Sequence, residues 1–97
     1  MTHIIFALYL AFLALDYLQT LTIARNPDKW HETNPILGPH PPEEGVNLWF
    51  LIVAVVSCIA YWYFADWRML SIAGVAVEGY YVVRNHRLGI RPADPRK

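Results

Sequence analysis

The chain has little of what most enzymes use. It contains one cysteine, Cys58, so no disulfide can form within the chain, and we expect this thiol to act as a small apolar side chain. No nucleophile elbow, phosphate-binding loop, His-Glu-x-x-His motif or Cys-x-x-Cys pair is present. The net charge is zero, and only the end of the chain is basic. We therefore predict no cofactor, no catalytic residues and no nucleic-acid partner.

What the chain has instead is apolar sequence, because 56% of its 97 residues are hydrophobic. They are concentrated in three runs, which are Ile4–Ala24, Val46–Phe64 and Met69–Val83. A helix of about 20 residues crosses the hydrocarbon core of a bilayer, and aromatic and basic flanks extend the short third run. We predict an all-α integral membrane protein, a single domain over residues 1–97, with transmembrane helices over 4–24, 46–64 and 67–84. The alternative for the third run is a re-entrant or interfacial segment.

The basic residues predict the orientation of these spans. Arg25 and Lys29 lie in the first loop, Arg68 alone lies in the second, and the other five follow the third run. One orientation places seven of the eight on the cytoplasmic side, and the inverse places one there. The positive-inside rule therefore predicts a multi-pass protein of the inner (cytoplasmic) membrane, N-terminus out and C-terminus in. Its proline-rich loop 26–45 and basic tail 85–97 would both be cytoplasmic.

Two of the three runs contain an acid, which is costly in a bilayer and therefore informative. Asp16, Gln19 and Thr20 are three and four residues apart, so they share one face of a helix. Glu78 shares a face of the third run with Ser71 and Gly74, and such small residues let a neighbouring helix approach closely. No lysine or arginine lies within the three apolar runs to neutralise either acid.

Two interpretations of these acids stay open. In the first, Asp16 and Glu78 meet, within one chain or between subunits, and share a proton or hold a cation. In the second, each acid is protonated and forms hydrogen bonds that hold neighbouring helices together. Potential partners in the second case carry hydroxyl or amide groups, and these are Gln19, Thr20, Ser57 and Tyr61.

A metal site in the first loop is a further hypothesis, with His31, Glu32 and His40 as weak candidate ligands. A zinc ion needs three or four ligands in fixed geometry. Because His31 and Glu32 are adjacent, both cannot easily face one ion from a regular helix. The pattern favours solvated histidines at the membrane interface, with no bound metal.

Three short motifs occur in order along the chain. Asp16-Tyr17-Leu18-Gln19-Thr20 lies in the first run, Glu32-Thr33-Asn34-Pro35 in the loop, and Tyr81-Val82-Val83-Arg84-Asn85 at the end of the third. Over residues 8–85 the chain resembles a family of small bacterial, archaeal and phage membrane proteins that has no assigned function. The resemblance implies a unit of three or four helices. It marks six positions, which are Asp16, Thr20, Glu32, Asn34, Pro35 and Asn85. The chain departs from this pattern in having no lysine early in the second span.

We predict a small non-enzymatic membrane protein surrounded by lipid, either a homo-oligomer or a subunit bound to another membrane protein. Its intramembrane acids would mediate helix contacts or the passage of ions or protons. One alternative is a phage-type holin that permeabilises the inner membrane, which the size, the three spans and the basic tail favour. Another is a small membrane enzyme or metal-binding protein that uses Asp16, Glu32 and Glu78.

Overall fold

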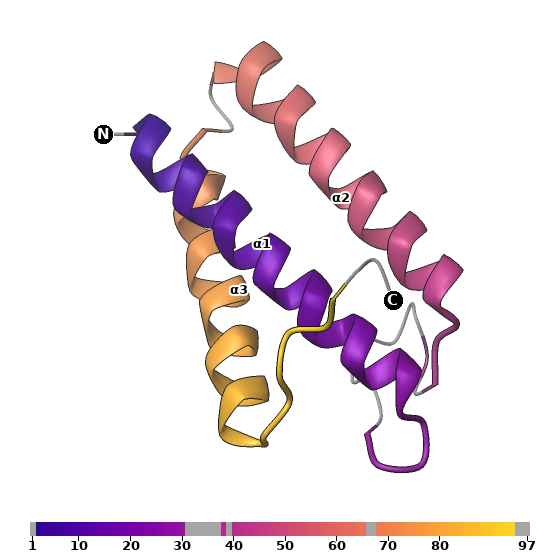
Figure 1. Ribbon diagram of the computed structural model, residues 1–97. Helices are drawn as coiled ribbons and strands as arrows, with labels where there is room; N and C mark the ends of the chain where they lie inside the picture. Colours follow the sequence, from indigo (N-terminus) through magenta and orange to yellow (C-terminus); the bar gives the residue numbers. More distant parts are fainter. Residues whose placement is uncertain (1, 31–37, 39, 66–67, 95–97) are drawn as a thin grey trace.

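The computed structural model describes residues 2–30, 38, 40–65 and 68–94 and contains three α-helices (Figure 1). They are α1 (Thr2–Arg25), α2 (Glu43–Tyr63) and α3 (Leu70–Arg87). Each predicted span corresponds to one helix. The predicted ranges differ from the observed ones by up to three residues, because hydropathy does not register the polar residues at the helix ends.

Local chemistry explains where α1 ends and α2 begins. α1 stops at Arg25 because Asn26 precedes Pro27, and proline disfavours helical backbone in the residue before it. Pro42 precedes α2 in an extended conformation, with φ −69° and ψ 155°. The first turn of α2 contains Glu43 and Glu44, whose negative charge favours the positive end of the helix dipole.

The end of α3 is a Schellman motif that reverses the chain. Gly89 has φ +88°, a left-handed conformation that glycine adopts readily. Its N–H donates to the carbonyl of His86 at 3.0 Å, and the N–H of Ile90 donates to that of Asn85 at 2.9 Å. The Ile90 side chain is buried. Residues 85–87, which the sequence analysis assigned to the tail, therefore belong to α3.

Residues 88–94, which we call the strap, run back along the last turns of α1. The N–H of Ala93 donates to the carbonyl of Leu18 at 2.9 Å, and the Thr22 hydroxyl donates to the carbonyl of Arg91. Arg25 fixes the strap further, because its Nη1 donates to the carbonyl of Asp94 at 2.6 Å. Its Nε also forms an ion pair with Glu43, with 2.8 Å between Nε and Oε1. The described part of the tail is thus packed against the helices.

α1 is the central helix of the fold, with α2 and α3 on different sides of it (Figure 1). The chain direction of α3 matches that of α1, whereas α2 runs the opposite way. α2 and α3 are consecutive and antiparallel, but both pack mainly on α1. The closest packing is between α1 and α3, where Tyr9 faces Gly74 and Phe12 faces Gly79.

Among the described residues, large apolar side chains lie on the surface of the fold as well as in its core. Twenty large hydrophobic side chains are exposed and eight are buried, whereas the buried set also contains Gln19, Thr20, Ser71 and Asn85. Two helices, α1 over His3–Arg25 and α2, are long and apolar enough to cross a membrane. Only 28% and 17% of these segments are buried, unlike the core helices of a soluble protein. α3 carries three charges, Glu78, Arg84 and Arg87, and does not meet the same criterion.

Candidate functional site between two helices

The polar face of α1 points toward α3 at the level of Gln19. The Gln19 side chain is 2% exposed, and its Nε2 donates to the carbonyl oxygen of Val82 at 3.2 Å. Its Oε1 accepts a hydrogen bond from Nδ2 of Asn85, also at 3.2 Å. Both bonds join α1 to α3. A buried amide without partners is costly, so this pairing favours one register of the two helices.

Thr20 and Asp16 form a second contact, within α1. The Thr20 hydroxyl donates to the backbone carbonyl of Asp16 at 2.7 Å, and it lies 3.3 Å from Oδ1 of the same residue. Thr20 is completely buried and Asp16 is half-buried. A threonine bonded to the carbonyl one turn earlier satisfies its hydroxyl without a partner on another helix.

Glu78 lies on α3 opposite the first half of α1. Its Oε2 is buried and forms no hydrogen bond within the described residues, and its carboxyl is in electrostatic range of the Tyr9 hydroxyl. Tyr9 in turn shares a 2.8 Å hydrogen bond with the Ser57 hydroxyl of α2. Tyr9 thus connects all three helices, because its ring also packs against Gly74.

The contacts given for the two acids involve different neighbouring residues. Oδ1 of Asp16 lies 3.3 Å from the Thr20 hydroxyl, and Oε2 of Glu78 forms no hydrogen bond among the described residues. Asp16 contacts Thr20 at the level of Gln19, whereas Glu78 lies nearer the level of Tyr9 and Phe12. Contact between the two acids, within one chain or between subunits, stays a prediction.

Among the hydroxyl groups expected to satisfy the acids, that of Thr20 contacts Asp16, whereas those of Ser57 and Tyr61 have other partners. Ser57 bonds Tyr9, and the Tyr61 hydroxyl lies 2.5 Å from Nδ1 of His3. The sequence analysis did not single out Tyr9. Its signal was a tyrosine in the middle of an apolar helix, away from the interface where tyrosine usually lies.

Part of the predicted loop site lies outside the described residues. This holds for His31, Glu32, Asn34 and Pro35. His40 is described and exposed. Among the residues described, no group of three or more His, Cys, Asp or Glu side chains is close enough to hold a metal ion. Asn85, expected to close the last span, lies in the last turn of α3 and bonds Gln19.

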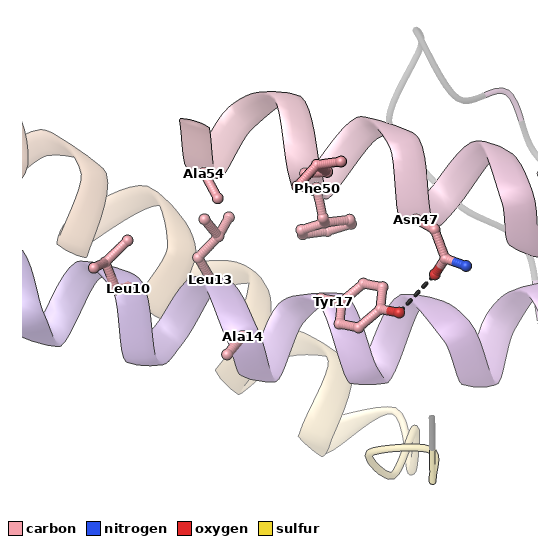
Figure 2. Close-up of a pocket in the computed structure, with 8 residues that line it drawn as sticks. Leu10, Leu13, Ala14, Tyr17, Asn47, Phe50 and Ala54 are labelled. Carbon is pink, nitrogen blue, oxygen red and sulfur yellow. Dashed lines mark hydrogen bonds between the residues drawn. The ribbon is translucent and has the colours of Figure 1, made fainter. Parts of the chain in front are cut away.

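An apolar groove of about 440 Å³ lies between α1 and α2 (Figure 2). At one end of it the Tyr17 hydroxyl donates to Oδ1 of Asn47 at 2.5 Å, and the Tyr17 ring lies beside Phe50. Small side chains, Ala14 and Ala54, form part of its wall. The groove has almost no polar surface, so it suits an apolar occupant.

Comparisons with protein-family models, with curated proteins and with solved structures find no match for this chain. The resemblance to small bacterial, archaeal and phage membrane proteins therefore stays a prediction based on the three short motifs.

Proposed function

We propose that this chain is a non-enzymatic protein of the cytoplasmic membrane that works as an oligomer or as a subunit of a larger membrane assembly. In this proposal α1, α2 and α3 all span the bilayer, with the N-terminus outside and the C-terminus inside. The polar side chains of α1 hold it to α3, and the apolar outer faces contact lipid or further helices.

The observation that carries the proposal is the burial of polar groups together with the exposure of large apolar side chains. Gln19 and Asn85 bond each other inside the fold, and twenty large hydrophobic side chains of the described residues face outward. In water this distribution would be unfavourable. In lipid it is expected, since polar groups there must find partners within the protein and apolar groups need none.

The distribution of cations supports the proposed orientation. Lys29 and Arg84 line one hollow, and Arg25 bonds the strap at the same end of the fold. Arg68 lies at the other end, where its guanidinium covers the Tyr61 ring at 5.2 Å and its Nε donates to the Tyr61 carbonyl. The positive-inside rule puts the end with more cations in the cytoplasm.

The groove between α1 and α2 supports the proposed assembly. The side chains of Ala14 and Ala54 in its wall are small, and small residues allow close approach of another helix. We propose that a helix of a second subunit packs there.

Two measurements test the proposal. The chain should stay in the membrane after alkaline carbonate extraction and need detergent for purification, and recovery as a soluble folded protein would refute it. In detergent, light scattering coupled to gel filtration should give an oligomer that Ala54→Trp weakens at least tenfold. Ala73→Trp, which adds the same ring at an exposed position of α3, is the control.

A second function, proton passage, is favoured by the buried Oε2 of Glu78. A buried carboxyl oxygen without a hydrogen bond is a place where a proton can bind, and Tyr9 and Ser57 continue a polar path toward α2. Proton flux into liposomes should then appear with the unmodified chain and be lost with Glu78→Gln. If the unmodified chain produces no flux above empty liposomes, proton passage is excluded and assembly stands alone.

A further inference from the structure

The outer side of α3 carries a groove that is apolar along its length and basic at its end. The hollow is about 570 Å³, and its walls include Ala76, Gly79, Tyr80 and Val83 before they end at Arg84 and Arg87. Tyr80 is 64% exposed and Val83 is 50% exposed, so this hollow lies on an outer face of the molecule. We call this hollow the α3 groove.

The two arginines of the α3 groove differ from the other described arginines. Arg25 is paired with Glu43, Arg68 with the Tyr61 carbonyl, and Arg91 with His86. Within the described residues, Arg84 and Arg87 have neither a hydrogen bond nor an ion pair. They are three positions apart on α3, so both guanidinium groups extend from the same side of the helix.

A third cation lies close to this pair. Arg84 also borders a second hollow, of about 300 Å³, whose wall contains Lys29 and Trp30 from the segment after α1. The Lys29 ammonium lies 5.1 Å from the centre of the Trp30 ring. Arg84 thus borders both hollows, with Arg87 beside it in the α3 groove and Lys29 and Trp30 beside it in the second hollow.

The arginines and the apolar walls of the α3 groove suit a ligand with both a negatively charged group and a hydrocarbon chain. Guanidinium groups match the oxygen atoms of a phosphate through paired hydrogen bonds, and their positive charge complements its negative charge. The apolar walls that lead away from Arg84 suit a hydrocarbon chain. A molecule with a negatively charged phosphate and an acyl chain fits both parts, and the cytoplasmic leaflet is rich in such molecules.

We propose that the α3 groove is a binding site for one anionic phospholipid, with the phosphate held by Arg84 and Arg87 and an acyl chain along Ala76 and Val83. Lys29 adds charge attraction from the neighbouring hollow. The site rests on the proposed membrane insertion of α3, because it needs the basic end of that helix at the headgroup level.

Native mass spectrometry of the full chain in detergent tests the site. Phosphatidylglycerol and phosphatidylcholine with identical acyl chains are titrated separately, and one bound phosphatidylglycerol per chain is expected at concentrations where phosphatidylcholine does not bind. Replacing both arginines (Arg84→Gln with Arg87→Gln) should weaken phosphatidylglycerol binding about 30-fold, since each cation near a membrane surface contributes about 1 kcal/mol. Arg91→Gln, which removes a nearby arginine already bonded to His86, is the matched control and should leave binding unchanged.

Two further measurements distinguish binding of a phospholipid from binding of a soluble phosphate. Ala76→Phe fills the apolar part of the α3 groove and keeps both arginines, so it should also weaken phosphatidylglycerol binding. Glycerol 3-phosphate at the same concentration should not displace the lipid, and efficient displacement would assign the arginines to a soluble phosphate instead. Equal binding of the two lipids, or unchanged binding by the double variant, would overturn the site. Neither result would affect the proposal of membrane insertion, which fails only if the chain is soluble without detergent.

Discussion

The amide group of Asn85 donates a hydrogen bond to the amide oxygen of Gln19 across the contact of α1 and α3, and both side chains are buried. The bond joins residues 66 positions apart in the sequence and fixes the end of α3 against the second half of α1. The Gln19 side chain also bonds the Val82 carbonyl. Gln19 is therefore the residue that most directly determines how the two helices align.

Gln19→Ala should destabilise the fold, because it removes two bonds and leaves the Asn85 amide without a partner. Bonds between membrane helices average about 0.6 kcal/mol and reach about 1.7, so we expect a loss of about 1–2 kcal/mol. Reversible unfolding in mixtures of detergent and dodecyl sulfate, followed by circular dichroism, measures it. In a double-mutant cycle the loss with Asn85→Ala added should be smaller than the sum of the single losses. Additive losses would mean that the two amides do not interact.

Gly74→Ala should also destabilise the fold. A methyl group at this position would lie 2.6 Å from Cδ1 and 2.8 Å from Cε1 of the Tyr9 ring, so the ring must move. Overpacking of this kind costs about 1–3 kcal/mol. Gly79→Ala is the matched control, because its added methyl would lie 3.9 Å from Phe12, an ordinary contact. Tyr9→Leu should remove most of the penalty, and equal penalties for the two glycines would contradict the described packing.

Glu78→Leu should leave stability unchanged within about 1 kcal/mol or increase it. The carboxyl oxygen Oε2 is buried without a hydrogen bond in the described part of the chain, so its removal breaks no bond and removes a desolvated group. The same unfolding titration measures the change. A loss of several kcal/mol would show that Glu78 has a partner that holds the helices together, such as an acid of a second subunit.

Gly89→Ala should loosen the strap, because alanine in the left-handed conformation at φ +88° costs about 1–2 kcal/mol. Hydrogen exchange should then become faster at the amides of Ile90 and Ala93, which bond Asn85 and Leu18. Gly45→Ala, at a helical position of α2 where an added methyl makes only ordinary contacts, is the control for the same substitution without backbone strain. If both variants exchange alike at these two amides, the Schellman motif does not hold the strap.

Induced expression beside a phage endolysin should not lyse the cells, since the proposed role is assembly without the opening of a large pore. Optical density and release of a cytoplasmic enzyme provide the readout, and a known holin serves as the positive control. Abrupt lysis at a fixed time after induction would favour the holin alternative instead.

Much of the helical layout follows from hydropathy, and the contacts between helices do not. The predicted span over 46–64 is observed as Glu43–Tyr63, because two acids after Pro42 extend the helix into sequence that looks like loop. The helix predicted over 67–84 is observed as Leu70–Arg87, since Gly89, and not the end of the apolar run, stops it. Both shifts come from capping chemistry that an average over many residues conceals.

The polar face of α1 could be read from the spacing of Asp16, Gln19 and Thr20, but its partner could not. Pairing Gln19 with Asn85 depends on the relative position of two helices that are separated by a third, and no local pattern encodes that position. The same limit applies to Glu78. Its face with Ser71 and Gly74 was visible in the sequence, whereas its place beside Tyr9 depends on the packing of that ring on Gly74.

The parallel pairing of α1 with α3 sets an order for biosynthesis. Gln19 is synthesised long before Asn85, with 66 positions between them, so in the proposed membrane protein α1 would enter the bilayer before the hydrogen-bond partner of its amide has been made. α2 cannot supply one, because it touches α1 mainly on the side of Phe50 and Val46. If the chain inserts as proposed, that amide depends on water, lipid headgroups or an insertion factor until α3 has been made and packs against α1.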